Sequence, residues 1–97
     1  MRHFHRTHLT PVQVLETADA FFPTLPLSPV STAPRARSFA GDLGKLTLTA
    51  RPEGGHWTMV EVHTDQMGES RLDRNVKRFF VELHRKDDPR HVLEASY

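Results

Sequence analysis

The chain has 97 residues, with 13 lysines and arginines against 12 aspartates and glutamates, and no cysteine. This length predicts one domain with a thin core, and the near-neutral charge provides no overall field to attract nucleic acid or anionic lipid. The absence of cysteine excludes disulfides and thiolate metal sites. No apolar run approaches the ~18 residues of a membrane span, and residues 1–9 lack the apolar segment of a secretory signal. We therefore expect a cytoplasmic protein.

Residues 1–9 are expected to form a polar, histidine-rich arm that contributes nothing to a core. His3, His5 and His8 form an H-x-H-x-x-H run, a pattern that could bind a transition metal. The run lacks a carboxylate and a fixed second set of contacts, which favours a solvated arm over a metal site. The sequence thus predicts no metal and no cofactor.

A helix is predicted over residues 11–22. Thr10 and Gln13 form a capping box, and Pro11 suits the first helical position. Pro23 ends the helix because a proline ring cannot continue it. The apolar stripe of this helix consists of Val14, Leu15, Ala18, Phe21 and Phe22.

Residues 23–34 read PTLPLSPVSTAP, and the four prolines favour an extended connection inside the domain. The alternative is a recognition motif for proline-binding modules. A first strand is predicted over 35–41, followed by strands over 45–51 and 57–64, where apolar and polar residues alternate. Gly54-Gly55 indicates the turn between the last two.

The alternation in the last two strands also predicts their register. We expect Leu46 opposite Val62 and Leu48 opposite Val60, so that the apolar faces coincide. On the reverse face this register places Arg51 opposite Trp57, where a cation–π contact becomes available.

A second helix is predicted over residues 70–86, beginning with a Ser70–Asp73 cap. Asp73–Lys77 and Glu82–Lys86 are expected as ion pairs on its solvent face. Its apolar stripe consists of Leu72, Val76, Phe79, Phe80 and Leu83. Residues 89–97 form a tail in which Val92 and Leu93 are the apolar positions.

The elements together predict an α+β fold in the order α-β-β-β-α, with two helices packed on one face of a small antiparallel sheet. The domain spans residues 10–88. Trp57 and Met59 then point outward from the uncovered sheet face, near Arg51. Such a composition is typical of protein interfaces, with Val92 and Leu93 as further candidates. The alternative is that the N-terminal arm or the tail covers Trp57 and Met59.

Catalytic patterns are absent or weak. Glu61, Asp65 and Glu69 predict no carboxylate dyad, and the glycines match no phosphate-binding loop. The basic second helix is interrupted by Asp73 and Glu82, which argues against nucleic acid. We expect that the protein is not an enzyme. An enzyme that uses His63 with Glu61 or Asp65 is a third hypothesis.

The segments starting at Thr10-Pro11, WTMVEVHT after Gly54-Gly55, and LDRNVKRFFVEL resemble small bacterial proteins. These are similar to shortened relatives of the helix-grip (START/polyketide-cyclase-like) fold. The resemblance covers roughly residues 10–86, and its most specific part is Asn75-Val76 before Phe79-Phe80. It implies a long C-terminal helix across a curved sheet. The chain has too few residues for the usual number of strands, and no catalytic residue carries over.

Two functional hypotheses follow. In the first, the protein is a non-catalytic accessory or structural protein that docks onto other subunits or onto itself; peripheral contact with a membrane complex stays open. In the second, a small apolar ligand binds in a groove between the second helix and the sheet. Its lining would be Phe21, Phe22, Phe79 and Phe80. The simpler alternative is that these four phenylalanines form the core.

Overall fold

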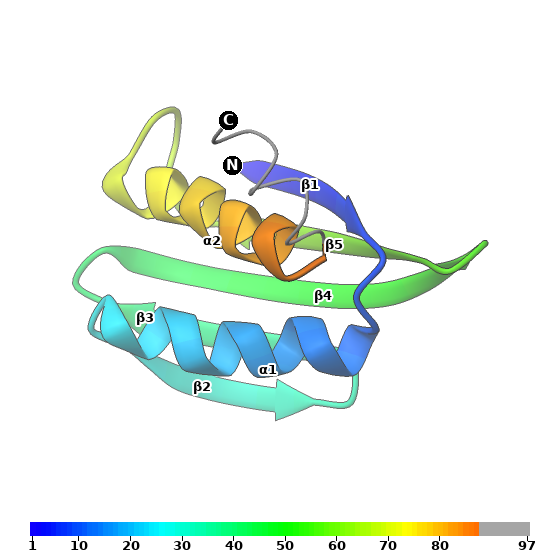
Figure 1. The fold of residues 1–97 in the computed structure, drawn as a ribbon. Helices are drawn as coiled ribbons and strands as arrows, with labels where there is room; N and C mark the ends of the chain where they lie inside the picture. Colours follow the sequence, from blue (N-terminus) through cyan, green and yellow to red (C-terminus); the bar gives the residue numbers. More distant parts are fainter. Residues whose placement is uncertain (88–97) are drawn as a thin grey trace.

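The computed structural model describes residues 1–87. Its five strands form one antiparallel sheet in the order β1-β5-β4-β3-β2, so that the first strand lies beside the last (Figure 1). The elements are β1 Arg2–Thr7, α1 Pro11–Phe21, the 3₁₀ turn η1 Phe22–Thr24, β2 Leu27–Ala33, β3 Ala36–Gly41, β4 Gly44–Gly54, β5 Trp57–Thr64 and α2 Arg71–Asp87.

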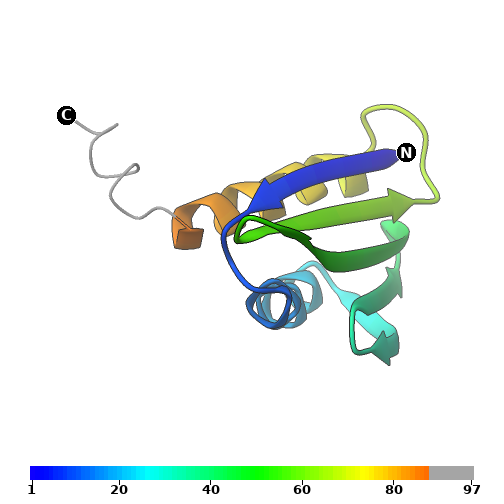
Figure 2. The same cartoon turned by 90° about the vertical axis from the view of Figure 1, so that its right-hand side faces the viewer.

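Both helices lie on one side of the sheet, which curves along its width (Figure 2). The core between the helices and the sheet centres on the fully buried Phe22, Phe39 and Phe79, where the Phe22 ring packs against the other two. The inward residues of β4 and β5 complete the core from the sheet side: Leu46, Leu48, Ala50, Val60 and Val62. Within the described residues no helix is long and apolar enough to cross a bilayer.

Local sequence patterns set the helix starts. Gln13 N–H donates to the Thr10 hydroxyl, and the Gln13 side chain accepts from Thr10 N–H, which confirms the capping box of α1. Ser70 accepts a hydrogen bond from Asp73 N–H at 3.1 Å and so caps α2. The α+β class, the antiparallel sheet and the two helices are therefore as predicted.

The number and order of strands differ from the prediction. The expected arm forms β1, which pairs with β5, and the proline-rich segment contains β2. Thr7 and Leu9 are buried, so the first nine residues do contribute to the interior. β2 is an edge strand with a register shift between Pro29 and Ser31, and an edge is where a sheet tolerates proline.

The predicted register of β4 and β5 is wrong by two residues. Leu46 faces Thr64, Leu48 faces Val62 and Ala50 faces Val60. A shift of two leaves every side chain on its predicted face, so hydrophobic alternation alone could not separate the two registers. In consequence Arg51 lies opposite Met59, not Trp57.

The ion pairs expected along α2 are also wrong. Asp73 is buried, with 1% of its surface exposed, and Lys77 pairs with Glu69 at 2.9 Å instead. Glu82 pairs with Arg85 at 3.2 Å rather than with Lys86.

Candidate functional site

The side of the sheet that faces away from the helices carries a mixed basic and apolar surface, which we call the outer face. Its residues alternate along the strands with the buried ones. It consists of Arg2, Phe4 and Arg6 on β1, Trp57, Met59, Glu61 and His63 on β5, and Lys45, Thr47, Thr49 and Arg51 on β4.

The register arranges these residues in rows across the strands. Met59 lies between Arg6 of β1 and Arg51 of β4. In the next row Phe4 pairs with Glu61, and 54% of the Phe4 surface is exposed. Sequence reasoning missed Phe4 and Arg6 as parts of this surface. No hydrophobic alternation from Arg2 to Thr7 signals the strand that carries them, because its inward residues include His3 and His5.

Trp57 is half-buried at one end of the outer face. The His8 ring lies over it with ring centres 3.8 Å apart, and the Arg6 guanidinium lies 5.1 Å from its ring centre. Residues at and just after the end of β1 thus cover Trp57 in part, while on the rest of this face Phe4 is exposed and Met59 is half-buried.

The residues of the enzyme hypothesis lie at the other end of this face. Glu61 Oε1 lies 3.1 Å from His63 Nε2 and 3.3 Å from Arg2 Nε. Asp65 forms no hydrogen bond or ion pair with His63 or Glu61; its Oδ1 accepts hydrogen bonds from the Lys45 backbone N–H and from the Gln66 side chain. These two hydrogen bonds hold the pKa of Asp65 below its usual range. His63 is exposed, and the neighbouring guanidinium balances the charge of Glu61. Arg2, Glu61 and His63 therefore form a cluster of ion pairs on the protein surface.

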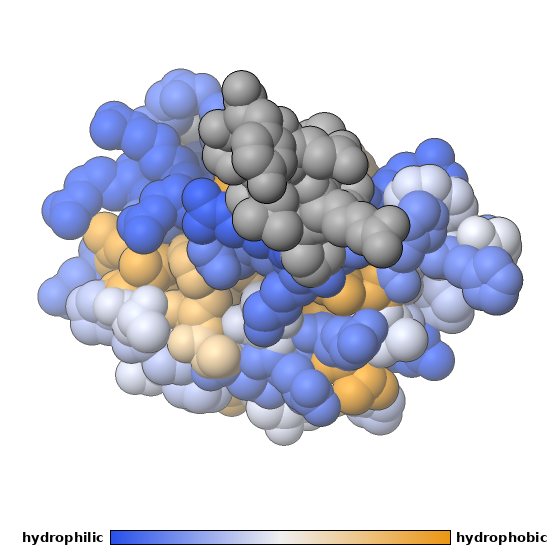
Figure 3. Space-filling model, in the orientation of Figure 1, coloured by the Kyte–Doolittle hydropathy of each residue, from blue (hydrophilic) through white to orange (hydrophobic). Residues whose placement is uncertain are grey.

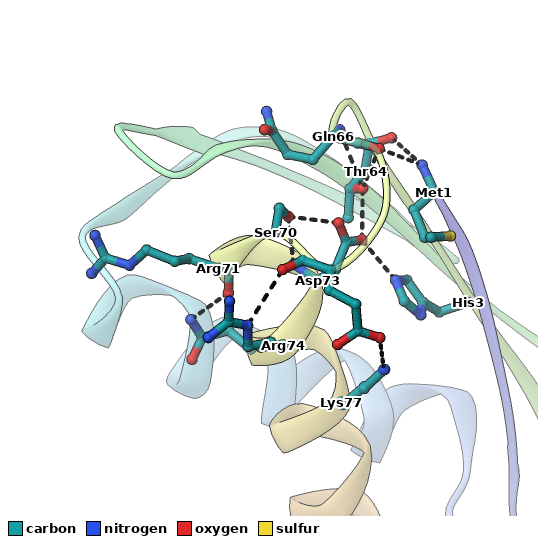
Figure 4. A network of polar contacts seen from close by, with 11 residues as sticks. Met1, His3, Thr64, Gln66, Ser70, Arg71, Asp73, Arg74 and Lys77 are labelled. Atoms are coloured by element: carbon teal, nitrogen blue, oxygen red, sulfur yellow. Dashed lines mark hydrogen bonds and ion pairs between the residues drawn. The ribbon is translucent and has the colours of Figure 1, made fainter.

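A polar network on the helix side surrounds Asp73 (Figure 4). Ser70 Oγ donates to Asp73 Oδ2 at 2.6 Å, while Thr64 Oγ1 and His3 Nε2 reach Oδ1 at 2.9 and 2.7 Å. Burial alone would raise the pKa of Asp73, but the hydrogen bonds from Ser70, His3 and Thr64 outweigh it and hold the pKa below its usual range.

This network contains Ser, His and Asp side chains but not in catalytic order. Ser70 and His3 both bind the carboxylate of Asp73, whereas a nucleophilic serine requires a hydrogen bond to the histidine. The arrangement fastens β1 and β5 to the first turn of α2 and is structural.

The three N-terminal histidines lie in separate environments. His3 binds Asp73, His5 stacks on Phe80 with ring centres 5.0 Å apart, and His8 lies on Trp57. Burial, and next to it the charge of His84, lowers the pKa of His5. Among residues 1–87 no three His, Cys, Asp or Glu side chains are placed to hold a metal ion.

The four phenylalanines of the ligand hypothesis divide between core and surface. Phe22 and Phe79 are fully buried and pack against each other with ring centres 4.9 Å apart. Phe21 is half-buried and lines an open cavity of about 230 Å³ between α1 and α2. A surface ligand could therefore contact only Phe21 and Phe80 of this set. Val92 and Leu93 lie outside the described residues.

No model of a known protein family matches the chain, and a comparison with curated proteins finds no match either. Function has to be inferred from the surfaces described above.

Proposed function

We propose that this protein is a non-catalytic docking protein whose outer face binds another protein. The single observation that supports this is the centre of the outer face, where the half-buried Met59 lies between Arg6 and Arg51 with the exposed Phe4 beside it. Aromatic, methionine and arginine side chains gathered on one surface are typical of interface centres, where they bury large areas and donate hydrogen bonds.

The charge of the outer face selects the kind of partner. The cations of the outer face are Arg2, Arg6, Lys45 and Arg51, and its one carboxylate is Glu61, which pairs with Arg2. Glu53, farther along β4, pairs with Arg6. Arg51 has no ion pair among the described residues. A partner with carboxylates around an apolar centre would complement this surface.

The same charges argue against self-association through this face. A symmetric dimer places one patch against its own copy, which would oppose Arg51 and Arg6 to each other across the interface. Like charges facing each other in a desolvated interface disfavour binding. A second protein of acidic character is therefore the partner we propose.

The resemblance to the helix-grip fold remains part of this proposal. The pairing of β1 with the last strand, β5, and the C-terminal helix α2 lying over the sheet support it. It adds nothing about the partner.

The test is capture of a partner that depends on the outer face. The full chain is immobilised and cross-linked in extract of its own cells, beside the variants Met59→Glu and Arg51→Glu. We expect both to lower partner recovery by about tenfold or more, since each opposes the partner's carboxylates. Arg85→Glu, a charge reversal on α2, is the matched control and should recover as much partner as the unchanged protein.

Equal recovery by all variants would overturn the proposal. So would a dimer in light scattering that Met59→Glu dissociates, because the partner would then be a second copy. Loss of the captured partner after nuclease treatment would point to nucleic acid on the outer face and would overturn it too. Circular dichroism of each variant ensures that a lost partner does not reflect a lost fold.

A further inference from the structure

A cavity of about 410 Å³ opens where the N-terminal half of α2 meets the β3–β4 turn and the connection between η1 and β2. Figure 3 shows apolar surface next to hydrophilic side chains on this left-hand side of the molecule. The volume falls within the range of small-molecule sites. The lining consists of Thr24, Leu25, Pro26, Asp42, Leu43, Arg71, Asn75 and Arg78.

Two arginines line this cavity from one stripe of α2. Arg71, Asn75 and Arg78 follow one another at helical spacing, which places them on the same side of the helix. Asn75 Oδ1 accepts from Arg78 Nη1 at 3.0 Å, and Asn75 Nδ2 donates to the Arg71 carbonyl at 2.8 Å. Asn75 is therefore held by the helix and orients Arg78.

Within residues 1–87 these two arginines lack carboxylate partners such as those of Lys77 and Arg85; Arg74, whose Nε donates to the Glu69 carbonyl, also lacks one. Lys77 pairs with Glu69 and Arg85 with Glu82, whereas no carboxylate of the described residues lies within 4.0 Å of the Arg71 or Arg78 guanidinium. Two unpaired guanidinium groups at one cavity form a site for an anionic head group, which they can bind through paired N–H donors.

The remaining walls decide which anion fits. Leu25 and Leu43 are half-buried and offer an apolar surface, which suits a ligand with a hydrocarbon body. Asp42 also lines the cavity, and its charge opposes a second negative charge on the ligand. A monocarboxylate therefore fits better than a phosphate dianion.

We propose that this cavity binds a small monocarboxylate, with the carboxylate at Arg71 and Arg78 and the apolar body against Leu25 and Leu43. The site lies on the helix side of the sheet and is independent of the outer face. It differs from the groove expected at Phe21, Phe22, Phe79 and Phe80, because it uses none of these residues.

The test is a titration of the ¹⁵N-labelled full chain with sodium octanoate, followed by NMR. We expect saturable shifts of the Leu25, Leu43 and Arg71 amides, with a dissociation constant of about 1 mM or tighter. Arg71→Gln and Arg78→Gln should each weaken binding by about fivefold or more because each removes one guanidinium. Asp42→Asn should strengthen it. Arg85→Gln is the matched control on the same helix and should leave binding unchanged.

Three results would overturn the site: no saturable shift with octanoate, equal binding of the neutral analogue octanol, or inorganic phosphate binding as tightly as octanoate. The second would show that the guanidinium groups do not contribute. The third would show that the apolar walls do not. Met59→Glu should still bind octanoate, and Arg78→Gln should still capture the partner protein. The two variants therefore test the cavity and the outer face separately.

Discussion

His3 Nε2 and Asp73 Oδ1 lie 2.7 Å apart although 70 positions separate the two residues in the sequence. This contact joins the edge strand β1 to the first turn of α2, and Thr64 brings β5 to the same carboxylate. One buried charge thus receives hydrogen bonds from β1, from the end of β5 and from Ser70 at the start of α2. Of these, only the contact from β1 bridges a long stretch of sequence, and it adds to the pairing of β1 with β5.

Asp73→Ala should lower the free energy of unfolding by about 3 kcal/mol, because it leaves the Ser70, Thr64 and His3 donors without their acceptor. Asp73→Asn should cost less, since the amide oxygen still accepts. Urea denaturation followed by circular dichroism measures both. Glu82→Gln, at an exposed ion pair of the same helix, is the control and should change stability by under about 0.5 kcal/mol. Equal effects of Asp73→Ala and Glu82→Gln would contradict a stabilising role for the network.

Acid should remove the contribution of Asp73 in a defined range. Hydrogen bonds hold its pKa in the folded protein below the usual value of 3.8, so the unfolded chain binds more protons in acid. The stabilisation is complete above the usual pKa and is lost as pH falls through the lowered one. The lowered pKa values of Asp65 and Glu69 act in the same direction. The difference in unfolding free energy between the unchanged protein and Asp73→Asn isolates Asp73, and a difference constant down to about pH 2 would contradict its lowered pKa.

His5 should destabilise the protein at mildly acidic pH. Burial is the main cause that lowers the pKa of His5. The charge of His84 lowers this pKa further, and the charge of Asp87 offsets part of the shift. Neutral His5 is therefore favoured in the fold, and stability falls as pH drops below the usual value of 6.5 towards the lowered pKa. The buried Nε2 has no hydrogen-bond partner within residues 1–87.

The substitution His5→Phe tests this, because phenylalanine keeps the stacking on Phe80 and cannot take up a proton. We expect a smaller drop in melting temperature between about pH 7.5 and about pH 5.5 than in the unchanged protein. His63→Gln, at an exposed histidine, is the control and should retain the drop. If the melting temperature of His5→Phe falls as much as that of the unchanged protein, another group causes the loss of stability.

The sequence predicted those features that local pattern determines. Thr10 and Gln13 cap a helix within four residues, and alternation alone places Met59 on the outer face. It missed β1 because the inward residues of that strand are His3 and His5, which meet Asp73 and Phe80 rather than an apolar core. A hydrophobic pattern cannot indicate a strand whose inner side is polar.

The candidate sites were harder to predict from the sequence, because they form through contacts between segments that are distant in the chain. The outer face needed β1 to supply Phe4 and Arg6, and the cavity joins three segments that lie far apart in the chain. The proline-rich segment concealed β2 for a different reason. An edge strand leaves part of its backbone unpaired, so Pro29 costs it little.

Gly41 should tolerate no side chain, because of space rather than backbone conformation. A Cβ atom there would lie 2.4 Å from the Pro26 carbonyl oxygen and 3.1 Å from Leu27 Cδ2. We expect Gly41→Ala to lower the free energy of unfolding by about 1–3 kcal/mol, since backbone must move. Gly54→Asn is the comparison in which only backbone strain acts: its φ is 85°, no atom lies within 4 Å of its Cβ position, and asparagine is among the residues that best tolerate positive φ, so its loss should be the smaller one. Similar losses in both variants would show that the Pro26 contact is not limiting.

Trp57 reports the register of β4 and β5 directly, since it is the single tryptophan of the chain. In the structure His8 and Arg6 cover its ring, and Arg51 lies opposite Met59. Acrylamide quenching of its fluorescence should therefore increase in His8→Ala, which uncovers the ring, and stay unchanged in Arg51→Ala. The register expected from alternation alone places Arg51 opposite Trp57, so quenching would then also increase in Arg51→Ala, whereas the His8 contact belongs to the β1 side and is the same in both registers. An increase in Arg51→Ala would therefore move the pairing by two residues and, with it, remove Arg51 from the row that holds Met59 and Arg6.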